Sequence, residues 1–250
     1  MSASRSSRPA VRRVVSLVPS LTEAVAVTEP GLLVGATDWC EHPAELDVAR
    51  VGGTKNPDTA RIVGLAPDLV IANEEENRAP DLAVLRAAGI EVLVTEVRTL
   101  PQAFTELERV LLRGCGLPRP AWLDEAREAW REVRADGPSL RAVVPVWRRP
   151  WMVLGRDTFA GDVLARLGVA NIHAAHAERY PRIPLDELNV CGAELVVLPD
   201  EPYRFTRDDG PESFPGLPSA LVSGRHLTWY GPSLAQAPRV LAAALRAAGR

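Results

Sequence analysis

The segment LPQAFTELERVLLRGCGLPRPAWLDEAREAWREVRADG, residues 100–137, decides how the chain is organised. Its first part predicts a helix over 103–112, and its second part predicts another over 119–135. Glycine and proline at 114–118 cannot continue a helix, whereas Pro120 suits a first helical turn. We therefore expect a helix here that connects two halves of the chain.

On both sides of this segment, short apolar runs alternate with short helical patterns, which is typical of βαβ units on a parallel sheet. We predict an α/β fold with two Rossmann-like lobes, each with a central parallel sheet, bridged by a single long backbone helix. The predicted parts are a polar tail at 1–11, an N-terminal lobe at 12–117, the connecting helix at 118–137 and a C-terminal lobe at 138–250.

Local signals set the expected helix ends. Ser20 begins the sequence SLTE, which has the spacing of a capping box and predicts a helix start at Ser20. Asn56 is a candidate cap for a helix over 58–65, and either Asp157 or Thr158 is expected to cap the helix that follows it. We expect 226–231 to form a loop.

Composition excludes several classes of protein. The chain has 250 residues, 46% of them hydrophobic and 24% charged, with a net charge of −3, so it has material for a large core and no basic surface for nucleic acid. Three cysteines, far apart in the sequence, do not indicate a disulfide framework. Residues 1–13 lack the apolar run of a secretory signal, and no stretch is long and apolar enough to span a membrane. We expect a cytoplasmic protein as the sequence is written, or an extracytoplasmic one if the true start lies upstream.

Ligands of parallel α/β sheets gather beyond the carboxyl ends of the strands, and four of the six tryptophans fall in the loops expected there. Flat apolar rings at these positions suit a bulky, partly apolar ligand, although each could instead pack beneath its loop as part of the core. The candidate ligand-binding residues are Ser20, Asp38, Trp39, Lys55, Asn73, Glu75, Trp151, Asp157, Phe159, Trp229 and Tyr230.

Lys55 is the only lysine of the chain and lies in the glycine-containing loop 52–57. A fixed cation beside a helix start can hold an anion, but the loop does not have the spacing of a Walker nucleotide-binding motif. The alternative is a solvated loop that tolerates a lysine.

Two further clusters could carry chemistry. The run 74–76 consists of three glutamates, which could form a solvated face, ligate a hard cation or dock onto arginines of a partner. Cys40 and His42 could ligate a metal, although two ligands fall short of a closed site. The sequence contains no nucleophile elbow, HExxH, CxxC or GxGxxG after a strand, which argues against an enzyme.

Several segments resemble the class III periplasmic binding proteins, the helical-backbone receptors for cobalamin, iron-siderophores and heme. They are RVVSLVPSLTE at 13–23, VGATDW at 34–39, VGGTKNP at 51–57, APDLVIA at 66–72, GRDTF at 155–159, GVANI at 168–172 and ELVVL at 194–198. The resemblance implies two α/β lobes joined by a rigid helix, with the ligand held between them. It also implies that one acidic residue on each lobe docks onto permease arginines, for which Glu76 and Glu201 are the nearest matches.

The leading hypothesis is a non-catalytic, monomeric receptor for a metal chelate, with cobalamin or a related tetrapyrrole ahead of a siderophore. It would need no intrinsic cofactor and would serve an ABC permease. Arg148, Arg149 and Arg156 keep a siderophore receptor open as an alternative. Two more hypotheses are a chelatase-like enzyme, with His42 or His226 acting beside Glu75, and a cytosolic metallocofactor sensor.

Overall fold

Two parallel β-sheets organise the chain in a computed structural model, which describes residues 10–134 and 139–248. Each sheet belongs to a different unit. Unit 1 comprises the described residues up to Glu96 together with Thr105–Pro120, and unit 2 comprises Val97–Phe104 together with the described residues from Ala121 onward. The predicted α/β class, with a parallel sheet in each of two lobes, is confirmed.

The sheet of unit 1 is five-stranded and parallel, in the order β3-β2-β1-β4-β5. Its strands are β1 (Val14–Ser16), β2 (Leu33–Ala36), β3 (Ala49–Arg50), β4 (Leu69–Asn73) and β5 (Glu91–Thr95). The chain leaves β1 toward β2 and β3, then returns to the other side of β1 for β4 and β5. The strand order therefore reverses between β1 and β4, and this position is the topological switch point of unit 1.

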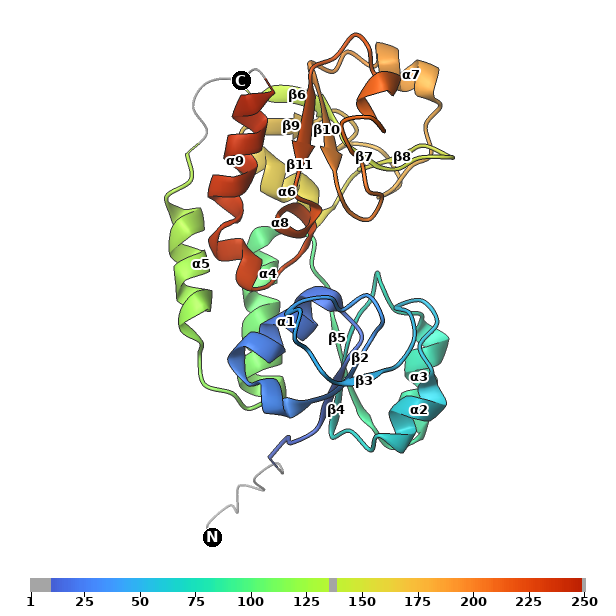
Figure 1. The fold of residues 1–250 in the computed structure, drawn as a ribbon, viewed down its shortest axis with the longest axis vertical. Helices are drawn as coiled ribbons and strands as arrows, with labels where there is room; N and C mark the ends of the chain where they lie inside the picture. The colour runs from blue at the N-terminus through green and yellow to red at the C-terminus, as the bar shows by residue number, and fades with distance from the viewer. Residues whose placement is uncertain (1–9, 135–138, 249–250) are drawn as a thin grey trace. The chain divides into compact units, whose positions relative to one another are not determined.

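Helices cover both faces of this sheet, α1 (Pro19–Thr28) on one and α2 (Thr59–Gly64) with α3 (Ala79–Ala87) on the other (Figure 1). The apolar side chains between these layers are fully buried, among them Val15, Leu17, Ile62, Val70 and Leu85. The left-handed φ of +82° at Gly89 lets the chain turn after α3 into β5.

Two predicted caps in unit 1 are wrong. Helix α1 begins at Pro19 rather than Ser20, and Val18 precedes it without a side-chain cap. Proline supplies a pre-formed first helical residue, so the capping-box spacing is not used and Ser20 lies buried inside the helix. Helix α2 is capped by Asp58, whose Oδ1 accepts the Arg61 N–H at 2.9 Å, and not by Asn56.

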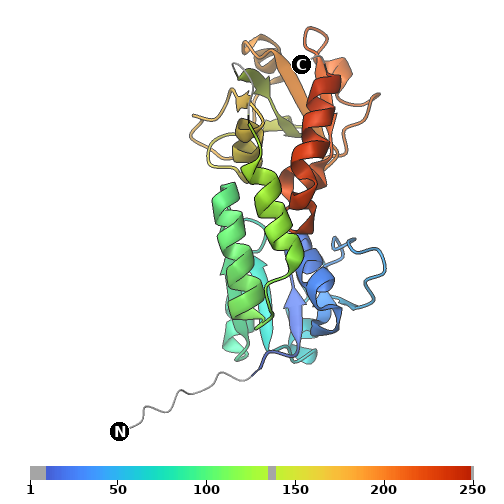
Figure 2. The same cartoon turned by 90° about the vertical axis from the view of Figure 1, so that its left-hand side faces the viewer.

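In chain order, the segment that follows the sheet of unit 1 forms α4 (Leu100–Glu108), a π-helix at Arg109–Gly114 and α5 (Ala121–Arg131). Helix α4 starts earlier than predicted because Asp162 Oδ2 accepts the Leu100 N–H at 2.9 Å. The first turns of α4 belong to unit 2 and lie beside α5 (Figure 2). The Arg127 guanidinium of α5 lies 4.8 Å from the centre of the Phe104 ring of α4. The predicted connecting helix corresponds to α5; residues 135–137 lie outside the described residues, and the domain limits stay predictions.

Unit 2 has a four-stranded parallel sheet in the order β11-β10-β6-β9. Its strands are β6 (Leu140–Val143), β9 (Val169–Asn171), β10 (Leu195–Pro199) and β11 (Ser219–Val222). The order reverses between β6 and β10, which is the switch point of this unit. Strand β6 leads directly into an antiparallel hairpin of β7 (Pro145–Trp147) and β8 (Met152–Val153).

Besides α5 and the first turns of α4, unit 2 contains the helices α6 (Phe159–Arg166), α7 (Leu185–Val190), α8 (Gly224–Thr228) and α9 (Ala237–Ala247), seen in Figure 1. Thr158, one of the two predicted caps, accepts the Gly161 N–H before α6. The prediction of a loop at 226–231 is wrong for its first residues, because they complete α8. Short 3₁₀ turns occur at Pro30–Leu32, Pro211–Ser213 and Pro232–Ala235. Within the described residues, no helix combines the length and apolar character needed to cross a membrane.

The segment 178–183 runs along the outer edge of β8 in unit 2. The Val153 N–H donates to the Pro181 carbonyl at 3.1 Å, and the Gly155 N–H donates to the Arg179 carbonyl at 2.7 Å. A Cβ on Gly155 would lie 2.9 Å from Pro181 Cδ and would overlap the Glu178 carbonyl. This close approach of two backbones requires glycine.

We predict that Gly155→Ala lowers the free energy of unfolding by about 1–3 kcal/mol, because the segment 178–183 must shift to admit a methyl group. Urea denaturation measures this change. Gly64→Ala is the matched control: no atom lies within 4 Å of its added Cβ, and in a helix alanine is favoured over glycine by up to about 1 kcal/mol. Equal stability of Gly155→Ala and the wild type would show that this approach is not tight.

Candidate functional site

The side chain of Asn77 joins three loops at the switch point of unit 1. Its Nδ2 donates to the Leu17 carbonyl, which follows β1, at 3.3 Å and to the Thr54 carbonyl, which follows β3, at 2.9 Å. Its Oδ1 accepts the N–H of Asn73, the last residue of β4, at 2.8 Å. One buried amide thus binds the exits of three strands into a single surface.

Asn73, a predicted ligand-binding residue, is also buried and has a structural task. Its Nδ2 donates to the carbonyl and hydroxyl of Thr95 at the end of β5, at 3.1 and 3.2 Å. Its Oδ1 accepts the N–H groups of Glu75 and Glu76, which fixes the start of the acidic loop. Asn73 therefore shapes the surface without being exposed on it.

The Lys55 side chain binds another loop of the same unit. Its Nζ donates to the backbone carbonyl of Glu75, so the ammonium group ties loop 52–57 to the acidic loop 74–77. The predicted anion-holding cation is therefore engaged by a carbonyl, and its effect on the site is to hold two loops together.

Trp39 presents the most exposed ring of this surface. Its side chain is 64% exposed, and its Nε1 lies 3.5 Å from where a Cβ on Gly53 would stand. The neighbouring Asp38 is also exposed, and its N–H donates to the Gly52 carbonyl. An exposed indole ring beside the backbone of a glycine offers a flat surface on which a planar ligand can stack.

Glu76 lies partly buried in the acidic loop. Burial and the neighbouring Glu75 raise the pKa of its carboxyl to about 7, while Lys55 lowers it. The charge of this surface therefore changes near neutral pH.

The candidate metal ligands Cys40 and His42 do not form a larger cluster. The Cys40 thiol is fully buried and lies 3.1 and 3.2 Å from the hydroxyls of Thr22 and Thr37, and burial raises its pKa. Across the described residues, no group of three or more His, Cys, Asp or Glu side chains could hold a metal ion. Metal ligation by this pair stays a prediction.

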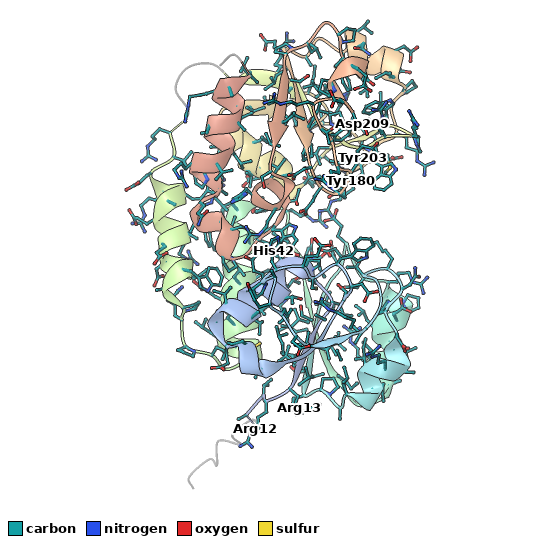
Figure 3. All side chains as sticks on the ribbon, in the orientation of Figure 1. Arg12, Arg13, His42, Tyr180, Tyr203 and Asp209 are labelled. Carbon is teal, nitrogen blue, oxygen red and sulfur yellow. The ribbon has the colours of Figure 1, made fainter. Side chains whose placement is uncertain are left out.

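At the switch point of unit 2, two aromatic rings from different loops meet. Trp147 ends β7, and Tyr203 follows β10; their rings lie edge to face with centres 5.6 Å apart. Trp147 is 42% exposed, and Tyr203 is partly buried. Figure 3 labels Tyr203 and its hydrogen-bond partner Asp209 on this part of the unit.

Further aromatic rings pack against this pair on the side of the core. Tyr203 packs on Phe205 at 4.7 Å, and Phe205 stacks on Trp151 at 6.0 Å, which in turn meets Phe214 edge to face at 5.3 Å. Trp151, a predicted ligand-binding residue, is thus part of the cluster beneath the surface. Its neighbour Trp147, four residues earlier, has the exposed position.

The remaining predicted residues of unit 2 lie elsewhere. Phe159 and Tyr230 are each 6% exposed and pack edge to face at 5.8 Å, so we leave them out of the proposed site, together with the buried Ser20 of unit 1. Trp229, a predicted ligand-binding residue, donates its Nε1–H to Oε2 of Glu201, a predicted docking residue, at 2.9 Å, so the two side chains are bonded to each other. Asp157 is exposed beside Arg156.

Trp147 and Tyr203 were not among the residues predicted from the sequence. The signal for Trp147 was its place at the end of an apolar run, in the loop 147–151 that was expected at a strand exit. Tyr203 had the same kind of signal, because it lies in the segment 201–205 that was expected at the exit of a later strand, but its contact with a ring 56 residues earlier could not be read from the sequence.

The fold is that of the periplasmic binding proteins, which confirms the resemblance predicted from the sequence. No protein-family model matches the chain. It is 25% identical over 191 residues to the vitamin B12-binding protein of Vibrio cholerae serotype O1, covering 74% of this chain and 69% of that protein.

Two solved structures show the same architecture. The periplasmic heme-binding protein RhuT from Roseiflexus sp. RS-1 aligns with a TM-score of 0.79 at 20% identity, over 96% of this chain and 100% of that one. The periplasmic vitamin B12-binding protein BtuF of Vibrio cholerae aligns with a TM-score of 0.73 at 19% identity, over 96% of this chain and 98% of that one.

We predict that Glu76→Gln stabilises the protein at neutral and alkaline pH but not at pH 4. The unfolded chain releases the Glu76 proton near the ordinary pKa of 4.5, whereas the folded protein keeps it until about 7. Wild-type stability therefore falls as the pH rises between these values and stays lower above pH 7. The variant should be about 1–3 kcal/mol more stable than the wild type at pH 8 and equal to it at pH 4, by chemical denaturation.

The control is Glu74→Gln, which removes the carboxylate of an exposed neighbour in the same loop. A difference between Glu76→Gln and the wild type that is the same at pH 4 and pH 8 contradicts the assigned pKa.

Proposed function

We propose that this protein is a non-catalytic substrate-binding protein for a flat metal chelate, cobalamin or a related tetrapyrrole. The observation that carries the proposal is the exposed ring pair of Trp147 and Tyr203 at the switch point of unit 2. Trp39 offers a second exposed ring among the strand exits of unit 1. Stacking on aromatic rings is the contact that a large conjugated macrocycle makes best.

The comparisons support this class of ligand. One relative is a vitamin B12-binding protein, and the two similar structures are periplasmic proteins that bind heme and vitamin B12. Both ligands are flat macrocycles around a metal. The relatives are binding proteins, which supports a receptor rather than a chelatase.

Pre-organisation supports a binding role for unit 1. The amides of Asn73 and Asn77 and the ammonium of Lys55 already fix the loops 52–57 and 73–77 to one another. A surface fixed before the ligand arrives loses little conformational entropy on binding.

The arginines of unit 2 favour a tetrapyrrole over an anionic siderophore. Arg148 binds the carboxylates of Asp209 and Glu212, and Arg156 lies 3.7 Å from an oxygen of Asp157. The alternative of a siderophore receptor was based on three arginines. Two of them are therefore paired with carboxylates of the same unit, which weakens their attraction for an anionic chelate.

The cellular role follows from the relatives. We propose that the protein delivers its ligand to an ABC permease and acts outside the cytoplasm, because the similar structures are periplasmic proteins. Docking through Glu76 and Glu201, the monomeric state and a ligand held between the two lobes stay predictions.

The first test is incubation with cyanocobalamin, hemin or a ferric siderophore, followed by desalting and absorbance. We expect the protein to retain cyanocobalamin or hemin unchanged and to release the siderophore. Retention of the siderophore alone, or insertion of metal into a free porphyrin, contradicts the proposal.

We predict that Trp147→Ala weakens binding of the retained tetrapyrrole by a factor of about five or more, since a stacked ring contributes on the order of 1–3 kcal/mol. Trp39→Ala should weaken binding in the same range. Trp122→Ala, which removes a ring of equal size from α5, is the control and should bind like the wild type. Fluorescence titration measures the affinities, and unchanged affinity in both Trp147→Ala and Trp39→Ala would remove the aromatic surfaces from the site.

A further inference from the structure

Tyr203 is held from two directions in the loop that follows β10. Its hydroxyl donates to Asp209 Oδ2 at 2.6 Å, and its ring contacts those of Trp147 and Phe205. The ring contacts restrain its tilt, while the hydrogen bond fixes the direction of the phenol oxygen. The orientation of this ring therefore depends on where Asp209 stands.

Asp209 is itself fixed by an arginine that is mostly shielded from solvent. Arg148 is only 10% exposed, and its Nη1 binds Asp209 Oδ1 and Glu212 Oε1. The guanidinium carbon lies 5.0 Å from the centre of the Trp151 ring, so the arginine also rests on the aromatic cluster. The Asp209 carbonyl accepts the Thr206 N–H at 3.0 Å, which closes the loop around the carboxylate.

This chain of contacts determines which part of Tyr203 is available. The hydrogen bond to Asp209 raises the pKa of the phenol, so Tyr203 keeps its proton at neutral pH and directs it toward the carboxylate. The phenol oxygen is engaged by Asp209 Oδ2, and the ring is the part of the side chain that contacts Trp147 and Phe205. What Tyr203 can offer a ligand is its ring.

We propose that Asp209 is a positioning residue, which through the chain Arg148–Asp209–Tyr203 sets the Tyr203 ring against Trp147 so that this surface recognises its ligand by stacking and not by phenolate coordination. The orientation of the ring stands on the contacts within unit 2. The part that concerns a ligand rests on the proposed function.

The test compares Asp209→Ala with two variants of matched charge. Asp209→Asn keeps an oxygen that can accept the phenol proton, and Glu212→Gln takes one negative charge from the same arginine without touching Tyr203. The readouts are the absorbance titration of tyrosine, near-ultraviolet circular dichroism and the affinity for cyanocobalamin. The chain has three tyrosines, and Tyr203→Phe identifies the signal of this one.

We expect Asp209→Ala to shift one tyrosine titration to lower pH, to weaken the circular dichroism of the ring pair and to lower the affinity for cyanocobalamin at least fivefold. Asp209→Asn should recover part of each change, and Glu212→Gln should stay within twofold of the wild-type affinity. The proposal is overturned if Asp209→Ala and Asp209→Asn leave the titration and the circular dichroism unchanged, or if Glu212→Gln lowers affinity as much as Asp209→Ala.

The two proposals fail in different ways. If the wild type binds neither cyanocobalamin nor hemin, the proposed function is wrong, and the titration and circular dichroism of the ligand-free variants still decide whether Asp209 positions the ring. If hemin binds with a phenolate-to-iron charge-transfer band that Tyr203→Phe abolishes, the stacking role of Tyr203 is wrong while the receptor function stands.

Discussion

The structure depends on how each unit completes its peptide hydrogen bonds where the strand order reverses. Neighbouring strands lead away from one another at such a point, so the carbonyl and N–H groups at their ends need partners outside the sheet. Unit 1 supplies the side-chain amide of Asn77, which binds groups after β1, after β3 and at the end of β4. Unit 2 supplies the hairpin that continues β6 and the turn in which the Phe205 N–H donates to the Pro199 carbonyl after β10. Exposed rings lie near these strand ends, with Trp39 in the loop after β2 of unit 1 and Trp147 at the end of β7 in unit 2.

Much of the fold could be predicted from local sequence. The β-branched runs marked the central strands, Gly89 marked the turn into β5, and the alternation of elements indicated parallel sheets in two lobes. These features depend on residues close together in the chain. The errors arose where two local signals competed, as at Pro19 and Ser20, where the proline at the first helical position left the capping box unused. Strand β9 had too short an apolar run to be recognised as a strand.

The candidate site could be predicted only in part, because exposure of a ring depends on what the rest of the chain packs against it. Trp39 was selected and is exposed, whereas Trp151 was selected and lies among Phe205 and Phe214. Trp147 and Trp151 belong to the same turn, and nothing local says which one faces outward. The same holds for Asn77, whose partner Leu17 is 60 residues away. Long-range packing, which a single sequence does not show, decides these assignments.

Several polar groups of both surfaces are engaged within the protein, Asn73, Asn77 and Lys55 in unit 1 and Arg148 and the Tyr203 hydroxyl in unit 2, and exposed rings lie beside them. The central claim is that a tetrapyrrole contacts these strand-exit loops. The most direct measurement is amide hydrogen exchange of the wild-type protein with and without cyanocobalamin. The account predicts slower exchange in loops 52–57 and 73–77 of unit 1 and in segments 147–151 and 203–209 of unit 2. Slower exchange confined to other segments, or no change in any of these loops while the ligand is bound, would contradict it.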